Sequence, residues 1–272
     1  MKDQRRIADF LDAELGRIGR IGEARNRQIH LLLERELAAI AATLSGSDEA
    51  AVERRETGWS WLPSVPAHWE IGPVCAYFDV LLGKMLNQER AAGPHPRPYL
   101  RNANVHWYEI NADDLAEMSF EAEERLRYRV RKGDLLVCEG GAGVAESAVW
   151  GGLVDEVYYQ KSLHRVRSRR HVPVEWLMYW LRLAKEVGVF ASDGNIATIP
   201  HLTGEQLRAY RIPIPPDGHS RVARLAEEVQ AMYRLASSLQ SGNSLLLENR
   251  QALITAAVTG QFDVTTAGRV ET

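Results

Sequence analysis

The segment from His219 to Gly260 reads HSRVARLAEEVQAMYRLASSLQSGNSLLLENRQALITAAVTG, and its apolar residues recur at alternating steps of three and four. Such heptad spacing is typical of long helices that pack against one another at a shallow angle. We expect this helix to form a seam with another helix, in a dimer or with a partner, through Leu225, Val229, Met232, Leu239, Asn243, Leu246, Arg250 and Leu253.

Two polar residues, Asn243 and Arg250, interrupt the seam at a positions of the heptad. Polar residues at such positions usually fix the register and orientation of paired helices at a cost in stability. Two interpretations stay open, because the same residues also suit a helix end that simply stops packing. Under the first interpretation, Asn243 and Arg250 determine the register of a dimer.

The N-terminal region carries a second version of this helix, from Gln4 to Gly46, which reads QRRIADFLDAELGRIGRIGEARNRQIHLLLERELAAIAATLSG. Leu31–Glu34 matches Leu245–Glu248, and the closing Gly46 falls on Gly260. The shared order and length indicate an internal repeat. A helix of about 40 residues is a rod of roughly 60 Å, long enough to hold two objects well apart.

Three glycines, Gly16, Gly19 and Gly22, lie in the middle of the N-terminal helix. Each costs about 1 kcal/mol relative to alanine in a helix interior. The glycines either allow another helix to approach closely or mark a local weakness, and the sequence leaves both interpretations open.

The composition, 45% hydrophobic and 25% charged over 272 residues, fits one core domain besides the helices. The charged start MKDQRRIADF and the lack of an apolar run of about 18 residues support neither export nor a membrane span, so we expect a cytoplasmic protein. The net charge of −3 argues against a generic polyanion binder. Cys75 and Cys138 are too few for a disulfide scaffold or zinc cluster, and we expect both to be reduced and buried.

Basic residues are nevertheless concentrated in two runs, ERLRYRVRKGD (Glu124–Asp134) and HRVRSRRH (His164–His171). On a strand, their period-two spacing would place the arginines on one face. Each run therefore has two interpretations, a stripe that contacts phosphates or a solvated strand face or turn.

The fold class that we predict is α+β, with one mixed α/β domain flanked by two long coiled-coil-forming helices. The N-terminal helix spans 1–46, a linker 47–56, the domain 57–217, the C-terminal helix 218–262 and a tail 263–272. Trp59, Trp61 and Trp69 are expected to anchor the chain to the domain. Within the domain we expect strands at 132–141 and 157–167, a helix at 172–187, and then a strand and a short helix before Pro216.

Catalytic signatures are absent from the sequence. The GGAGVA segment, Gly140–Ala145, lacks the lysine and the spacing of a phosphate-binding loop and is better interpreted as a glycine turn. The patterns H-E-x-x-H and G-x-S-x-G do not occur, and the histidines are scattered singly. We therefore expect a chain with no catalytic residue, metal or cofactor of its own.

Several segments of the middle domain, taken in order, resemble the target recognition domain of type I restriction-modification specificity (S) subunits. They are PYLRNANV (Pro98–Val105), GDLLVCEGG (Gly133–Gly141), YYQKSLHRVR (Tyr158–Arg167), TIPHLTGEQL (Thr198–Leu207) and IPIPP (Ile212–Pro216). QRRIADFLD, Gln4–Asp12, looks like the start of the helix that follows such a domain, and WLPSVPAHWE, Trp61–Glu70, like the beginning of the next one.

The resemblance implies a half-length form, and two interpretations of it stay open: a half-S subunit or the C-terminal part of an interrupted S gene. Complete S subunits alternate two recognition domains with two antiparallel helices, whereas this chain has the order helix, one domain, helix. Two copies related by a two-fold axis would supply two identical domains, which predicts a homodimer and an interrupted palindromic DNA target. The resemblance also implies double-stranded DNA, methylation (M) subunits and, through them, restriction (R) subunits as partners.

Side chains with paired donors and acceptors read base edges, and cations bind phosphates. On the family-like segments, the candidates for DNA contact are Lys84, Arg101, Asn102, Asn104, Tyr159, Gln160, Lys161, His164, Asn195, Thr198 and His201. Asn102 and Asn104 have an equally good alternative, in which they hold a turn through bonds to the backbone. Gln160, Lys161 and Thr198 also suit a role of positioning the DNA without specifying its sequence, with base readers in 86–96 or 142–150.

A rival hypothesis is a protein-binding module or decoy, in which the helices dock methylation subunits and the domain does not read DNA. The acidic balance and the single domain favour this alternative. The ordered recognition-domain motifs favour DNA reading.

Overall fold

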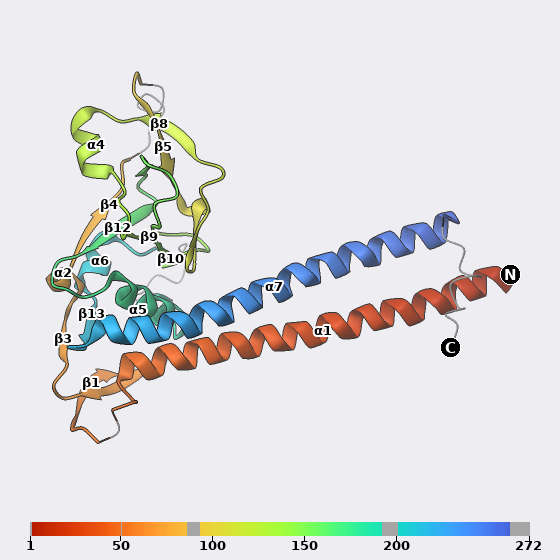
Figure 1. Ribbon diagram of the computed structural model, residues 1–272, viewed down its shortest axis with the longest axis horizontal. Helices are drawn as coiled ribbons and strands as arrows, with labels where there is room; N and C mark the ends of the chain where they lie inside the picture. Colours follow the sequence, from red (N-terminus) through yellow and green to blue (C-terminus); the bar gives the residue numbers. More distant parts are fainter. Residues whose placement is uncertain (1, 50, 86–92, 192–200, 262–272) are drawn as a thin grey trace. The chain divides into compact units, whose positions relative to one another are not determined.

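A computed structural model describes residues 2–49, 51–85, 93–191 and 201–261 of the chain (Figure 1). Its residues divide into two compact units, a helical unit of 1–36 with 227–272 and a domain unit of 37–226. Two long helices run through both units, α1 from Lys2–Ser45 and α7 from Gly218–Thr259. The predicted class, a mixed α/β domain flanked by two long helices, is confirmed.

The helical unit is an antiparallel pair, drawn in red and blue in Figure 1. Arg35 Nη2 lies 3.3 Å from Glu228 Oε1, and Asn243 Nδ2 donates to Asn26 Oδ1 at 2.8 Å. Later residues of α7 therefore contact earlier residues of α1, as in an antiparallel pair. Val229 is fully buried. The heptad seam of α7 therefore packs within the chain.

The seam loosens along α7. Val229 and Met232 are buried, Leu239, Asn243, Leu246 and Leu253 are half-buried, and Arg250 is exposed. Leu225, in the domain unit, is buried as well. The outer half of the helix therefore keeps exposed surface along the predicted seam.

The glycines of α1 do not make room for α7. Among the described residues, a Cβ added at Gly19 or Gly22 would meet nothing within 4 Å, and one at Gly16 would meet only the Arg20 side chain. The close approach occurs instead at Gly242 of α7, where a Cβ would lie 2.7 Å from Arg25 Nη1. Within this chain, the glycines of α1 thus only weaken the helix.

The centre of the domain unit is a four-stranded antiparallel sheet in the order β10-β9-β12-β4. Its strands are β4 (Phe78–Leu82), β9 (Leu135–Cys138), β10 (Ser147–Val149) and β12 (Leu163–Ser168). All four residues of β9 are buried, as a continuous apolar run in a sheet core requires. The strand that we predicted at 132–141 is confirmed.

A second sheet has three strands in the order β11-β5-β8. Strand β11 (Tyr158–Tyr159) is parallel to β5 (Pro96–Leu100), and β8 (Ala116–Ser119) is antiparallel to it. Three two-stranded pairs complete the domain: β1 (Arg54–Trp59) with β2 (Leu62–Pro66), β3 (Glu70–Pro73) with β13 (Arg211–Ile214), and β6 (Val105–His106) with β7 (Glu109–Ile110).

Short helices link these strands. They are α2 (Val74–Tyr77), α4 (Ala122–Tyr128), α5 (Val174–Glu186) and α6 (Gly204–Ala209), with 3-10 turns η1 (Asn102–Asn104) and η2 (Val189–Ala191). Helix α5 confirms the predicted helix at 172–187. Trp176 of α5 packs edge-on against Trp69 at 5.8 Å, and Trp61 packs against Trp180 at 5.9 Å, so two of the three predicted tryptophan anchors hold α5 directly.

Two sequence expectations were wrong, the single strand at 157–167 and the burial of Cys75. The predicted strand 157–167 is two strands in different sheets, because the chain turns at Gln160–Ser162. The basic run Glu124–Asp134, for which the sequence left two interpretations open, lies on helix α4 and on the turn Arg131–Asp134 that follows it; the reciprocal bonds of Glu121 and Glu124 cap α4. Cys75 is exposed, whereas Cys138 is buried, and burial raises the pKa of its thiol to about 12.

The predicted domain limits stay predictions. Strand β1 already begins at Arg54, inside the segment that we predicted as a linker, and the predicted tail 263–272 lies outside the described residues. In the described part of the chain, no helix is long and apolar enough to cross a membrane.

Candidate nucleic-acid interface

Four segments of the domain meet at a loop cluster, which we define as Asn102, Gly140, Gln160–Ser162 and His201. The Asn102 side chain donates from Nδ2 to the Gly140 carbonyl at 2.8 Å, and its backbone N–H donates to Ser162 Oγ at 3.2 Å. Gly140 and His201 form an antiparallel bridge. These contacts bring together segments that are up to about a hundred residues apart in sequence.

The close approach of two backbones fixes one side of the loop cluster. Lys84 and Gln160 form a parallel bridge, and the Lys161 N–H donates to the Lys84 carbonyl at 2.8 Å. A Cβ at Gly83 would lie 2.2 Å from the Gln160 carbonyl oxygen, which leaves no space for a side chain. Glycine at position 83 therefore determines where the Gln160–Ser162 turn lies.

The loop cluster presents polar groups suited to DNA. Lys161 and His201 are exposed, and Gln160 and Asn102 are half-buried. The Lys161 ammonium has no ion-pair partner among the described residues, so its charge is available to a phosphate. His201 Nε2 lies 3.4 Å from Glu139 Oε1. In the described chain, no donor reaches Asn102 Oδ1.

Four other predicted residues lie in the interior, with at most 4% of their surface exposed: Lys84, Asn104, Tyr159 and His164. Asn104 holds a turn, because its Oδ1 accepts from Arg101 N–H and its Nδ2 donates to Asn111 O. The turn-holding alternative for Asn104 is thus what the structure shows. As folded, these four side chains do not reach the surface, and we leave them out of the proposed DNA contacts.

Lys84 has a structural role instead. Its ammonium donates to Glu124 Oε2 and to the Ser119 carbonyl, both at 2.6 Å, and lies 4.9 Å from the centre of the Phe120 ring. A buried cation is tolerated when its donors are satisfied in this way. Lys84 also forms the β-bridge to Gln160, and Glu124 belongs to α4. This ion pair therefore joins α4 to the loop cluster.

His164 lies in β12 beneath the loop cluster and is fully buried. Its Nε2 donates to the Leu202 carbonyl at 2.8 Å. Burial lowers the pKa of His164 to about 4, with a smaller contribution from the positive charge of Arg208. His164 is therefore a neutral structural residue at pH 7.

The remaining predicted residues are Arg101, Asn195 and Thr198. Arg101 Nη2 pairs with Asp114 Oδ2 at 3.0 Å on the surface. Asn195 and Thr198 lie outside the described residues.

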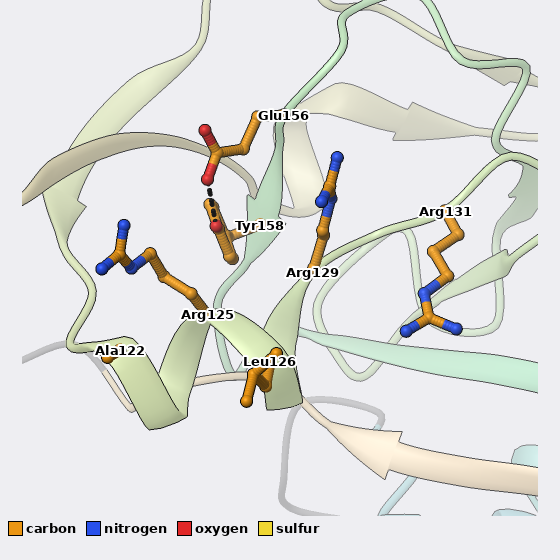
Figure 2. Close-up of a pocket in the computed structure, with 7 residues that line it drawn as sticks. All are labelled: Ala122, Arg125, Leu126, Arg129, Arg131, Glu156 and Tyr158. Atoms are coloured by element: carbon orange, nitrogen blue, oxygen red, sulfur yellow. Dashed lines mark hydrogen bonds between the residues drawn. The ribbon is translucent and has the colours of Figure 1, made fainter.

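A second charged feature is the basic hollow, and none of the residues that line it is among the predicted site residues. We define it as the hollow of about 270 Å³ lined by Ala122, Arg125, Leu126, Arg129, Arg131, Glu156 and Tyr158. Figure 2 shows the three arginines and Glu156 that line the hollow, and the Glu156 carboxylate accepts a hydrogen bond from the Tyr158 hydroxyl at 2.5 Å. That bond, followed by the charges of nearby arginines, holds the pKa of Glu156 below its usual value. The alternating arginines of the run Glu124–Asp134 were the sequence signal that could have indicated this hollow.

The second basic run supports the first. Arg165 and Arg167 of β12 donate to the carbonyls of Arg127 at 2.9 Å and Arg129 at 3.1 Å. Arg167 also binds both oxygens of Asp134, at 2.5 and 2.7 Å. Arg165 and Arg167 are therefore bound by other groups of the protein.

The described residues contain no group of three or more histidines, cysteines or carboxylates that could hold a metal ion. No protein-family model matches the sequence, and comparison with curated proteins gives no match.

Comparison with solved structures gives a clear likeness. The HsdS subunit from Thermoanaerobacter tengcongensis matches 96% of this chain with a TM-score of 0.55 and 18% identity. A chain from a structural study of complex assembly and conformational transition of the type I R-M system matches 93%, with a TM-score of 0.56 and 19% identity. The chain has the HsdS fold. It spans only 59% and 58% of the length of these two HsdS-like chains. Within the HsdS fold, the loop cluster and the basic hollow both belong to the mixed α/β domain.

Proposed function

We propose that this chain is a DNA-recognition (specificity) subunit of a type I restriction-modification complex, which directs methylation and restriction subunits to their site and performs no catalysis itself. The observation that carries the proposal is the loop cluster, where the segments of Asn102, Gly140, Gln160 and His201 converge. Their amides, imidazole and nearby ammonium are groups that contact phosphates and base edges. The HsdS fold of the whole chain supports the same role.

We propose further that two copies associate, so that two domains read an interrupted palindrome. The outer half of α7 supports this proposal, because residues 235–259 carry only two charged side chains, Glu248 and Arg250. Leu235, Leu245, Leu247 and Val258 are exposed there, with 51–73% of their surface accessible. A stretch of this kind on a surface helix is typical of an interaction site. The occupant that we propose is a second copy of this chain.

DNA binding is tested with the full chain and mixed-sequence duplex DNA by fluorescence anisotropy, with and without a methylation subunit. We expect binding that weakens as salt rises. Lys161→Ala should weaken binding to all sequences and lower the salt slope by about 1. Arg234→Ala, an exposed arginine of α7, serves as the control. Docking of methylation subunits without any DNA binding would favour the rival protein-binding module.

Association is tested by size exclusion with light scattering at micromolar concentration. A particle of twice the chain mass is expected, and a strict monomer would overturn the dimer. Selection from random duplexes in the presence of the methylation subunit should then return an interrupted palindrome.

A further inference from the structure

The basic hollow carries more positive charge than the protein neutralises. Its lining holds three arginines and one carboxylate, Glu156, which leaves an excess of two positive charges. The guanidinium groups of Arg125 and Arg131 form no hydrogen bond or ion pair with a side chain of the described residues, whereas the Arg129 guanidinium donates to the Asp155 carbonyl at 3.2 Å. A cluster of like charges is unfavourable in the free protein, so an anionic ligand would stabilise it.

The backbone around Arg131 is held in place by a turn. Arg131–Asp134 form a turn, with Asp134 N–H donating to Arg131 O at 2.9 Å and Gly133 at a φ of +90°. The Asp134 carboxylate accepts the Arg131 N–H at 2.7 Å. Arg131 and Lys132 therefore lie on an exposed, fixed turn, and both also line a neighbouring hollow of about 510 Å³. The positive surface thus continues from Arg125 to Lys132.

The basic hollow lies close to the loop cluster. Tyr158 lines the hollow and Gln160 belongs to the loop cluster, so their Cα atoms are at most about 7 Å apart along an extended chain. That distance is smaller than the roughly 12 Å width of the major groove of B-DNA. The Lys84–Glu124 ion pair further connects α4, which carries Arg125, to Gln160.

We infer that Arg125, Arg129, Arg131 and Lys132 form a phosphate-binding surface that grips the DNA backbone beside the bases contacted by the loop cluster. This inference rests on the proposed function. The surface supplies affinity without sequence information, because arginine and lysine bound to phosphates do not distinguish bases. Its guanidinium groups suit phosphate oxygens, to which arginine can donate two parallel hydrogen bonds. Leu126, 81% exposed among these arginines, can contact deoxyribose.

The test uses the full chain carrying Arg125→Gln with Arg131→Gln, and fluorescence anisotropy with a mixed-sequence duplex between about 50 and 200 mM salt, a range over which the Debye length falls roughly twofold. We expect the slope of log affinity against log salt to fall by about 2, one for each phosphate that the variant no longer neutralises. The ratio between the affinity for DNA sequences selected with the unaltered chain and the affinity for random sequences should not change. The matched control, Arg211→Gln with Arg234→Gln, removes the same charge from exposed positions elsewhere and should leave the slope unaltered.

Each outcome decides the inference. A slope that is unaltered in the Arg125/Arg131 variant, or lowered equally in the control, overturns the phosphate-binding surface while leaving the proposed function standing. Absence of DNA binding by the unaltered chain overturns the proposed function and the surface together. Thermal unfolding checks that the variants fold, and Arg131→Gln with Lys132→Gln, on the exposed turn, repeats the test if the first variant unfolds.

Discussion

Lys84 Nζ lies 2.6 Å from Glu124 Oε2, and this ion pair joins the end of β4 to α4 across 40 residues of sequence. The Lys84 side chain is 5% exposed and that of Glu124 is 27% exposed. The pair therefore couples the two features that we assign to DNA, the loop cluster through the Lys84–Gln160 bridge and the basic hollow through α4.

Replacing Lys84 with methionine should lower the free energy of unfolding by about 3 kcal/mol. This value is at the low end of the cost of breaking a buried ion pair, because Glu124 retains some contact with water. Urea denaturation measures it. In the double variant Lys84→Met with Glu124→Gln, no charge is left unpaired, so part of the loss should be recovered. A loss below about 1 kcal/mol in the single variant would show that the pair adds little stability.

Replacing Gly83 with alanine should cost about 1–3 kcal/mol, because its Cβ would overlap the Gln160 carbonyl oxygen and force the backbones apart. Gly151→Ala is the control, since a Cβ there meets nothing within 4 Å and Gly151 has no positive φ. Thermal and urea unfolding of both variants decide the matter. Equal stability of the two variants would mean that the Gln160 turn relaxes without cost.

The heptad pattern was enough to predict both long helices, because the residues that define it are local and periodic. Val229 and Met232 are buried as that pattern requires. The apolar run Leu135–Cys138 likewise predicted a buried strand. Local patterning therefore gave the fold class, and the resemblance of ordered segments indicated the loop cluster.

Burial of single polar residues could not be predicted in the same way. Lys84 is charged and was predicted to contact DNA, but its partner Glu124 comes from a distant helix. The arginines of β12 look identical to those of α4 in sequence, yet Arg165 is buried and Arg125 is half-buried beside the hollow. Only the tertiary contacts of each side chain separate a supporting residue from a candidate contact.

Replacing Gly19 and Gly22 with alanine should stabilise the chain by about 1 kcal/mol each, because neither Cβ would meet a described atom and alanine is the better helix former. Thermal unfolding followed by circular dichroism at the helix band measures the gain. Light scattering on the same variant tests the other interpretation of these glycines. Loss of a dimer would show that a second chain packs closely against them.

Acid should unfold the chain partly through His164. Its pKa is about 4 in the folded protein, where burial disfavours the charged ring, and near the ordinary 6.5 in the unfolded chain. The unfolded state therefore binds a proton more readily between these values. The contribution of neutral His164 to the free energy of unfolding is complete above pH 6.5. It is lost as the pH falls toward 4, by about 3 kcal/mol in all.

The measurement is urea unfolding of the unaltered chain and of His164→Gln at intervals from pH 7.5 to 4. Glutamine can still donate to the Leu202 carbonyl, as His164 Nε2 does at 2.8 Å, but it does not titrate. The carboxylates titrate in both proteins and cancel in the difference. The unaltered chain should lose stability more steeply below pH 6.5, by up to one extra proton taken up on unfolding. Parallel curves would mean that His164 becomes protonated in the folded state without penalty, and that its burial does not oppose the charge.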